Sequence, residues 1–369
     1  MKNNQLTYIY QNGRKNRINK KEYPKEFFYG MDYISKSFKK TEIIEFNEKK
    51  VGKISTFLST LLQKVTGLPF FLNNIINSKN LRIFLDSDLL VMTNQRVAFS
   101  SFPFLIINKI LGRSKSSVFI MGLFDVKHKN IIKNSLRRIN ILLLMVLVDK
   151  LLFLSNGEYK YVKNKYKKLG QKSYFIAFPV DKDFWEEKEI DNLNNNLLFI
   201  GNDGKRDYEF ILSLAKEMSE YNFTFITSKI TQDEIGSNNI NLIYGRWDEE
   251  TLTDEEIKKH YHNSALTIIP IKDSLQPSGQ SVALQSISCG TPVLITKTRG
   301  FWDHDLFIND KNIIFVEKNE IELWKNKINN CFSNKNYYVE LTKKGKENIT
   351  EHYDLNKFNK KLEDILFNY

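Results

Sequence analysis

The sequence of 369 residues is poor in cysteine and in long apolar runs. Its two cysteines, Cys289 and Cys331, exclude a disulfide framework and suit a reducing compartment. No zinc-type spacing of Cys and His is present. The longest uninterrupted apolar run, 141–148, is far shorter than the roughly 20 residues of a transmembrane helix. Because the first residues also lack the apolar region of a secretory signal, we expect a cytoplasmic protein that contacts a membrane at most at its inner face.

Acidic residues are scarce in the first half of the chain and abundant in the second. The whole sequence has 55 Lys and Arg, 43 Asp and Glu, and a net charge of +12. Residues 1–190 contain 34 basic and 16 acidic residues, whereas 191–369 contain 21 basic and 27 acidic residues. A uniformly basic nucleic-acid-binding protein would not show this division, and no recognition motif is present. The asymmetry predicts two domains with different partners, and no nucleic acid among them.

Short apolar runs alternate with helical patterns along the chain, as is typical of βαβ units that form a parallel sheet covered on both faces. The first series of expected strands comprises 6–11, 41–46, 89–93, 118–121, 151–154 and 174–177. Its expected helices are 27–38, 54–76, 97–111 and 128–148. The second series of strands comprises 197–200, 223–227, 240–243, 266–270, 292–295 and 313–316. Its expected helices are 207–219, 253–263, 279–289, 319–330, 335–350 and 356–367.

The polar stretch 186–196 separates the two series. We therefore expect an α/β protein of two doubly wound, Rossmann-like domains. The first comprises residues 1–185, and the second comprises residues 186–369, with the last helix able to pack back on the first domain. In such sheets the ligand lies beyond the carboxyl ends of the strands, which makes the cleft between the two domains the expected site.

The most informative segment is 266–300, in which a buried strand leads through a polar loop into a helix. We expect Ser278 or Ser281 to cap this helix, and Gly279 to let an anion approach the backbone closely. Gly290 is a natural left-handed stop for the helix. The N–H groups at such a helix start attract a phosphate. An ordinary βαβ unit has the same pattern, so residue spacing alone does not distinguish a phosphate-binding helix start from a helix start that binds no ligand.

This segment resembles the donor-site helix of GT-B-fold glycosyltransferases, specifically those similar to family 4 (the group 1 transferases). The match is Ser288-Cys289-Gly290-Thr291-Pro292-Val293. The family pattern has two glutamates at the positions of Pro277 and Gln285. The resemblance implies that Gln285 bonds the donor ribose, whereas Pro277 cannot replace the carboxylate near the transferred sugar.

A second match follows the first strand of the second domain, in the loop Gly201-Asn202-Asp203-Gly204-Lys205-Arg206. In the resembled family, this loop places a glycine against the diphosphate and basic side chains near its charge. A solvated helix start with two exposed bases is the alternative explanation. The resemblance implies donor-binding roles for Gly201, Asn202, Lys205, Arg206, Arg246, Ser278, Gly279, Gln280, Ser281 and Gln285.

The first domain gives weaker signals. Gly13 and Arg14 follow its first strand and are expected on the acceptor side. They do not form a G-x-G-x-x-G motif, which disfavours an NAD-dependent enzyme. Many relatives have a histidine after the strand that corresponds to 118–121. Here Asp125 and His128 are the candidates for contact with the acceptor, but a surface position among Lys127, Lys129 and Lys133 is the favoured explanation of His128, so no catalytic base is assigned.

Asp86 and Asp88 form a D-x-D pattern next to an apolar run. In GT-A transferases two such carboxylates hold Mn²⁺ or Mg²⁺ on the donor diphosphate. This pattern is common, and a GT-A enzyme would leave the loop at Gly201 and the segment 278–293 without a role. A metal-dependent GT-A-like transferase is therefore the alternative enzyme.

Basic residues in the first half form three clusters, and the second leads directly into the apolar run 139–148. A basic surface beside apolar residues would bind anionic lipid headgroups. We expect the helix at 139–148 to be buried and the basic surface to be solvated. The clusters are Arg14, Lys15, Arg17, Lys20 and Lys21; Lys127, Lys129, Lys133, Arg137 and Arg138; and Lys160, Lys163, Lys165, Lys167 and Lys168.

The sequence thus predicts a GT-B glycosyltransferase, either free in the cytoplasm or peripheral at the membrane. Its substrates would be a nucleotide-sugar donor and a glycan or lipid-linked acceptor, in cell-envelope polysaccharide or lipopolysaccharide synthesis. The resemblance implies retention of configuration, no cofactor and no metal. A catalytically silent GT-B scaffold or sugar-binding protein, suggested by Pro277 and Gln285, is the alternative from another class.

Overall fold

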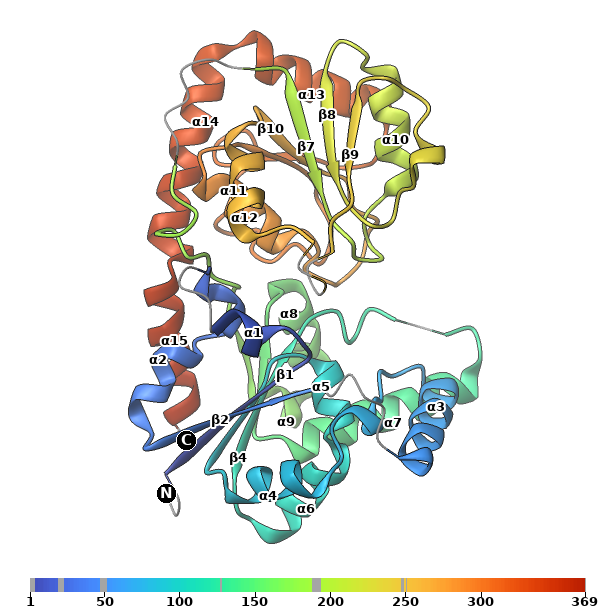
Figure 1. Cartoon of the computed structure of the whole chain (residues 1–369), viewed down its shortest axis with the longest axis vertical. Helices are drawn as coiled ribbons and strands as arrows, with labels where there is room; N and C mark the ends of the chain where they lie inside the picture. Colours follow the sequence, from blue (N-terminus) through green and yellow to red (C-terminus); the bar gives the residue numbers. More distant parts are fainter. Residues whose placement is uncertain are drawn as a thin grey trace. The chain divides into compact units, whose positions relative to one another are not determined.

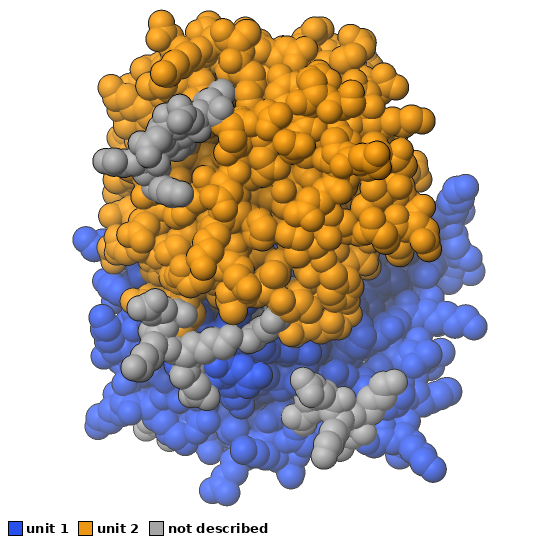
Figure 2. Space-filling view, turned by 45° about the horizontal axis from the view of Figure 1, so that its top comes forward, with its two compact units in different colours: residues 1–21, 28–176, 359–369 blue, residues 22–27, 177–358 orange. Residues whose placement is uncertain are grey.

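The structure is a computed structural model with two compact units. Unit 1 comprises residues 1–21, 28–176 and 359–369, and unit 2 comprises residues 22–27 and 177–358 (Figure 2). The sequence suggested a single boundary after residue 185, whereas the chain leaves unit 1 after Ile176 and each unit also includes a short remote segment. Part of the expected linker, 188–193, lies outside the described residues. The structure describes residues 4–18, 23–46, 52–126, 128–187, 194–246, 249 and 251–368.

A six-stranded parallel sheet forms the centre of unit 1, in the order β2-β1-β3-β4-β5-β6, and helices flank it (Figure 1). The strands are β1 (Gln5–Tyr10), β2 (Lys40–Glu45), β3 (Leu89–Met92), β4 (Lys115–Ile120), β5 (Lys150–Phe153) and β6 (Ser173–Phe175). The helices are α1 (Arg14–Ile18), α2 (Met31–Ile34), α3 (Lys53–Thr66), α4 (Ser78–Asp86), α5 (Gln95–Ser100), α6 (Phe102–Leu111), α7 (Ile131–Leu147), α8 (Asn156–Lys165) and α9 (Lys167–Gly170).

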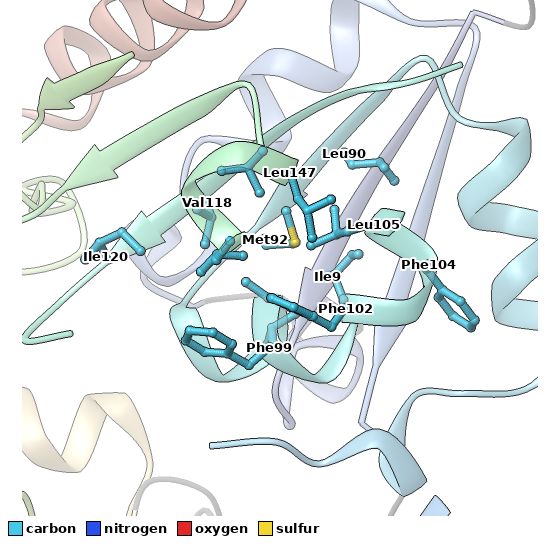
Figure 3. Close-up of a cluster of buried hydrophobic side chains, with 14 of the residues drawn as sticks. Ile9, Leu90, Met92, Phe99, Phe102, Phe104, Leu105, Val118, Ile120 and Leu147 are labelled. Atoms are coloured by element: carbon cyan, nitrogen blue, oxygen red, sulfur yellow. The ribbon is translucent and has the colours of Figure 1, made fainter. Parts of the chain in front are cut away.

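The core of unit 1 lies between the sheet and its helices. Ile9, Met92 and Val118 project from three neighbouring strands and pack against aromatic and aliphatic side chains of α5 and α6, among them Phe99 and Leu105 (Figure 3). All five are fully buried. Strands covered on both faces have continuous apolar runs, and these runs are the signal that located the strands in the sequence.

Two helices expected in unit 1 are shorter than predicted. The pattern at 27–38 is interrupted by Tyr29 and Gly30, whose φ angles of 53° and 77° leave only α2 and short 3₁₀ turns. The pattern at 54–76 ends at Gly67, which takes the left-handed conformation and donates its N–H to the carbonyl of Gln63 at 2.8 Å. Left-handed backbone ends a helix because it points the next residues away from the helical path.

The sheet of unit 2 is also six-stranded and parallel, in the order β12-β11-β10-β7-β8-β9. The strand order reverses between β7 and β10, which pair through Leu197 with Leu266 and Leu198 with Thr267. Ligands of doubly wound sheets bind in the crevice outside the carboxyl ends of such a pair. The strands are β7 (Asn196–Ile200), β8 (Asn222–Ile226), β9 (Ile240–Ile243), β10 (Leu266–Ile269), β11 (Val293–Thr296) and β12 (Ile314–Val316).

Helices of unit 2 follow the predicted pattern closely, and the α/β class with two doubly wound parallel sheets is confirmed. The final helix, α15, begins in unit 2 and continues into residues that belong to unit 1. The helices are α10 (Tyr208–Glu217), α11 (Asp254–His262), α12 (Gln280–Ser288), α13 (Ile321–Ser333), α14 (Lys335–Asn348) and α15 (Leu355–Phe367).

The expectation that the helix at 139–148 is buried is wrong for one of its faces. Ile141 and Leu144 of α7 lie in the core, but Ile139 and Val146 are 58% and 48% exposed. Arg137, expected on the basic surface, is buried instead and donates hydrogen bonds to the carbonyls of Gly67 (2.9 Å) and Leu123 (2.8 Å). Among the described residues, no helix combines the length and apolarity needed to cross a bilayer.

Candidate functional site

A pocket of about 290 Å³ lies in unit 2, beyond the carboxyl end of β7. Its walls come from part of the loop after β7, from described residues between β9 and α11, and from α11 and α12. Because α12 follows β10, the pocket lies at the point where the strand order of the sheet reverses. The topology of the sheet therefore accounts for the place of the pocket.

Arg206 lies in the wall of this pocket with only 3% of its surface exposed. Its Nη1 is 3.0 Å from Oδ2 of Asp203, and its Nε donates to the carbonyl of Ile200 at 3.3 Å. A Cβ on Gly201 would lie 2.4 Å from this Nε, so the glycine leaves the space in which the guanidinium lies. The position of Arg206 is thus fixed before any ligand binds.

The loop after β7 is bonded directly to the loop after β10. The N–H of Asp207 donates to the carbonyl of Pro270 at 3.0 Å, and the N–H of Lys272 donates to the carbonyl of Lys205 at 2.8 Å. These bonds hold the two loops in one register. Lys205 does not line the pocket, so the structure separates it from Arg206, its neighbour in the predicted set.

Asn202 lines the pocket, but its side chain holds loops together. Its Nδ2 donates to the carbonyl of Gly245 at 2.6 Å, and its Oδ1 accepts from the N–H of Ser228 at 2.7 Å and the hydroxyl of Thr227 at 3.1 Å. The amide therefore joins the ends of three neighbouring strands.

The start of α12 differs from the prediction in two ways. Gly279 is the N-cap, with φ of 82° and no side-chain capping bond, so neither Ser278 nor Ser281 caps the helix. A Cβ on Gly279 would lie 2.9 Å from Cγ2 of Ile269, so the glycine is required by backbone conformation and by packing on the sheet. The backbone conformation and the packing account for a glycine at position 279 without the predicted approach of an anion.

Two buried polar groups at this helix start lack a hydrogen-bond partner within the described protein. They are Oγ of Ser278 and Nε2 of Gln280, in side chains that are 6% and 4% exposed. Buried polar groups are rarely left unpaired, because the lost hydrogen bonds to water are costly. Ser281, one residue further along, lines the pocket, whereas Ser278, Gly279 and Gln280 do not.

Gln285 lines the pocket and is held by two side chains. Its Oε1 accepts from the hydroxyl of Tyr261 at 3.2 Å, and its Nε2 donates to Oε1 of Glu26 at 3.0 Å. Tyr261, which also lines the pocket, is fully buried. The orientation of the Gln285 amide is therefore determined by one donor and one acceptor of the protein.

Glu26 was missed by the sequence analysis. Its carboxylate is fully buried, accepts from Nε1 of Trp185 at 2.6 Å and from the N–H of Asp181 at 3.3 Å, and belongs to unit 2. Burial, with a smaller contribution from the charge of Asp181, raises the pKa of Glu26 to about 7, although its hydrogen bonds oppose the shift. Glu26 is 259 residues from Gln285 in the chain, so no local motif connects them.

The rest of the pocket wall is largely apolar. Phe27, Ile226 and Leu252 contribute to this surface, while Arg246 and Asp254 add charge. The guanidinium of Arg246 forms an ion pair with Glu249. A pocket with an apolar wall and two arginines suits a ligand that combines a flat ring with an anionic group.

Gly13 and Arg14 lie in unit 1 at the end of β1. Gly13 has φ of 80°, and the N–H of Arg14 donates to Oε1 of Glu45 at 2.6 Å. The guanidinium of Arg14 lies 5.8 Å from the ring centre of Tyr10, and burial lowers the pKa of Arg14 to about 10. This arrangement places a partly buried cation at the carboxyl edge of the unit 1 sheet.

Asp125 and His128 follow β4 in unit 1, and neither lines the pocket of unit 2. The His128 ring packs against Gly67, where a Cβ would lie 2.1 Å from its Nε2. Burial and the charges of Lys133 and Arg137 lower the pKa of His128. Packing against Gly67 therefore accounts for the position of the imidazole without a bound acceptor.

Glu158, at the start of α8, is a second buried carboxylate that the sequence did not indicate. It accepts from the N–H groups of Gly122 (2.7 Å) and Phe124 (2.8 Å), and so holds the loop after β4. Burial raises the pKa of Glu158 to about 7. Its role in the structure is to pair backbone donors of that loop.

Asp86 and Asp88 lie at the amino end of β3, the edge opposite to the one where doubly wound sheets bind ligands. Oδ2 of Asp88 accepts from the N–H of Gln5 at 3.0 Å, and Oδ2 of Asp86 lies 3.9 Å from Nε of Arg82. The GT-A-like alternative therefore receives no support from the position of these carboxylates. Across the described residues, no three His, Cys, Asp or Glu side chains are grouped so that they could hold a metal ion.

No protein-family model and no curated protein sequence matches the chain. Solved structures do match. Sucrose-phosphate synthase from Thermosynechococcus elongatus is similar over 98% of this chain and 98% of its own, with a TM-score of 0.70 and 11% identity. HepE from Anabaena, in complex with UDP and glucose, is similar over 99% and 100%, with a TM-score of 0.69 and 11% identity. A glycosyltransferase from Rickettsia africae is similar over 99% of both chains, with a TM-score of 0.64 and 12% identity. The chain therefore has the GT-B fold of these glycosyltransferases.

Proposed function

We propose that the protein is a glycosyltransferase that takes a sugar from a nucleoside-diphosphate donor bound in the pocket of unit 2. The observation that carries the proposal is the composition of that pocket, in which an apolar wall lies beside Arg206 and Arg246 at the reversal point of the sheet. A nucleoside diphosphate presents a flat base and two phosphates, which match these two kinds of surface.

The pocket residues support a specific division of roles. Arg206, held by Asp203, would form charge-assisted bonds to the diphosphate and stabilise it as it leaves the sugar. The start of α12, where Ser281 lines the pocket and no side chain caps the backbone, would supply further donors, and the unpaired groups of Ser278 and Gln280 lie beside it, outside the pocket wall. Gln285, oriented by Glu26, would bond the ribose. In this proposal Lys205, which does not line the pocket, attracts the diphosphate only through its charge and without direct contact.

The finer features of the reaction come from the resemblance and from the charge of the chain. We propose transfer with retention, without a metal or other cofactor, to a glycan or lipid-linked acceptor in cell-envelope polysaccharide or lipopolysaccharide synthesis. The acceptor would contact unit 1, with Gly13 and Arg14 at the edge of its sheet. Its basic surface suits an anionic acceptor or membrane.

A catalytically silent protein that binds a nucleotide-sugar is the second candidate. It is favoured by Pro277, which offers no carboxylate, and by Gln285, whose amide is already bonded to Tyr261 and Glu26. Such a protein would keep the donor pocket and lose the transfer step. Binding and turnover therefore separate the two candidates.

Calorimetric titration with UDP, GDP and ADP, each with and without EDTA, tests the proposal. HepE and its complex with UDP-glucose make UDP the first nucleotide to try. We expect one diphosphate to bind in the presence of EDTA, and the matching nucleotide-sugar to be consumed when cell-envelope lipids are added. No binding by any of the three would contradict both candidates. Binding without consumption of any donor would favour the silent protein, and loss of binding in EDTA would favour a metal-dependent enzyme.

A further inference from the structure

Exposed large hydrophobic side chains concentrate on three helices of unit 1. Fourteen of the eighteen such side chains in the described residues fall between Ile54 and Val146. Single exposed apolar residues are normal on a protein surface, but a concentration on neighbouring elements indicates an interaction. They are Ile54, Phe57, Leu58 and Leu61 on α3; Ile106, Ile110 and Leu111 on α6; Ile131, Ile132, Leu136, Ile139, Leu143 and Val146 on α7; and Val126 just before α7.

These helices are neighbours in the fold, and α7 packs against both α3 and α6 (Figure 1). On α7 the spacing of Ile132, Leu136, Ile139, Leu143 and Val146 places all five on one side of the helix. The opposite side carries the buried residues that face the core of unit 1. The helix is thus apolar on two faces, and the core uses only one of them.

The same region is almost free of acidic residues. Helices α3, α6 and α7 contain no aspartate or glutamate, and residues 49–148 contain 15 Lys and Arg against three Asp and Glu. Lys53 and Lys64 lie exposed at the two ends of α3, and Arg138 lies exposed in the middle of α7. On these three helices, the charged residues that accompany the exposed apolar side chains are therefore all basic.

We propose that α3, α6 and α7 form a surface that inserts into an anionic lipid membrane. Such a membrane satisfies both properties at once, because its acyl boundary receives the isoleucines and leucines and its headgroups pair with the lysines and arginines. A nucleic acid would satisfy the charge and leave the apolar side chains in water. A symmetric second copy would cover the apolar side chains but would bring like charges together.

The inference builds on the proposed lipid-linked acceptor, but it is tested without any sugar transfer. Flotation of the full chain with vesicles of equimolar phosphatidylglycerol and phosphatidylcholine should recover the protein in the lipid fraction, and pure phosphatidylcholine should not. Raising the salt from about 0.1 M to about 1 M, which shortens the screening length from about 10 Å to 3 Å, should reduce the recovery. A chain that stays out of anionic vesicles, or that floats equally with both kinds, would overturn the proposal.

A pair of substitutions assigns the binding to this surface. Ile132→Glu with Ile139→Glu, at positions 72% and 58% exposed, should lower the bound fraction about tenfold, because each change removes an apolar contact and adds a repelled charge. Leu323→Glu with Val339→Glu on exposed positions of α13 and α14 is the matched control and should float as the unchanged chain does. Equal flotation of both double variants would overturn the assignment.

The charge and the alternative occupant are tested separately. Lys64→Glu with Arg138→Glu should also reduce flotation while circular dichroism stays unchanged, because both side chains are exposed. Retained flotation of this variant would remove the electrostatic part of the proposal. Sedimentation of the chain without vesicles should show a monomer, and a dimer that Ile132→Glu with Ile139→Glu dissociates would assign the surface to a second copy instead.

Discussion

The two units of this protein share one plan and differ in what their surfaces offer. Both have a six-stranded parallel sheet of doubly wound type. Unit 2 has a pocket at the point where its strand order reverses and a net negative charge, whereas unit 1 has exposed apolar helices and all of the excess positive charge. The sheet therefore serves only as the scaffold in both units, and the loops and outer helix faces decide what each unit binds.

Each unit also contains one fully buried glutamate with a pKa raised to about 7. Glu158 in unit 1 accepts hydrogen bonds from two backbone N–H groups of one loop. Glu26 in unit 2 accepts from two side chains of the pocket, Trp185 and Gln285. The first carboxylate stabilises a loop, and the second also sets the orientation of a proposed ligand-binding group.

The largest expected effect is a pH dependence of stability that arises in both units. Because the native state holds a proton on Glu26 and Glu158 more tightly than the unfolded chain does, the free energy of unfolding should fall as pH rises from about 4.5 to about 7. Each carboxylate should contribute about 3 kcal/mol to this fall. Urea unfolding at a series of pH values measures it.

Single variants show how much of this pH dependence of stability comes from each unit. All four tryptophans lie between residues 177 and 358, so tryptophan fluorescence reports on unit 2 alone. Glu26→Gln should flatten the pH dependence of the fluorescence transition, while Glu158→Gln should leave that transition unchanged and alter the one seen by circular dichroism. Identical pH profiles for both variants and the unchanged chain would show that neither glutamate titrates as we expect.

The next effect concerns the pocket of unit 2 alone. Arg206→Ala should weaken binding of the nucleoside diphosphate by about 1.5–3 kcal/mol, because a charge-assisted hydrogen bond to the diphosphate is lost. Lys205→Ala, one position away but outside the pocket wall, is the matched control and should cost less than about 0.5 kcal/mol. Calorimetry at constant salt measures both. Equal losses for the two variants would remove Arg206 from its proposed role.

The smallest effect is expected for a carboxylate of unit 1. Asp88→Asn keeps an oxygen that can accept from the N–H of Gln5, and it lies at the amino edge of its sheet. We expect the nucleotide affinity to change by less than about 0.5 kcal/mol, as for other surface changes away from a site. A large loss of affinity in this variant, measured by the same calorimetry with Mn²⁺ present, would revive the metal-dependent alternative.

The sequence indicated the strands well and some helices poorly, for physical reasons. Buried parallel strands such as β4 and β10 are continuous apolar runs, which are visible in the sequence. The helical periodicity at 27–38 did not show that Tyr29 would take a positive φ, because tertiary packing decides this. The apolar run 139–148 predicted a buried helix. Sequence periodicity shows that a helix face is apolar, but it does not show whether that face packs in the core or lies on the surface.

The candidate site was predictable only where it depends on local motifs. Gly201, Arg206, Ser281 and Gln285 come together as the resemblance suggested, since each follows a strand at the carboxyl edge of one sheet. Glu26 could not be predicted in this way. It reaches Gln285 across 259 residues of sequence, and a lone glutamate in a polar segment carries no signal of burial.

The short remote segments of the two units have a consequence for how the chain is made. Residues 22–27 are synthesised before most of unit 1 but belong to unit 2, and residues 359–369 are synthesised after all of unit 2 but belong to unit 1, where Nζ of Lys150 donates to the carbonyl of Asn368 at 2.7 Å. Unit 1, whose synthesis begins first, is therefore completed only after unit 2. A fragment cut at residues 177 and 358 would lack Glu26, and the indole of Trp185 would lose its acceptor.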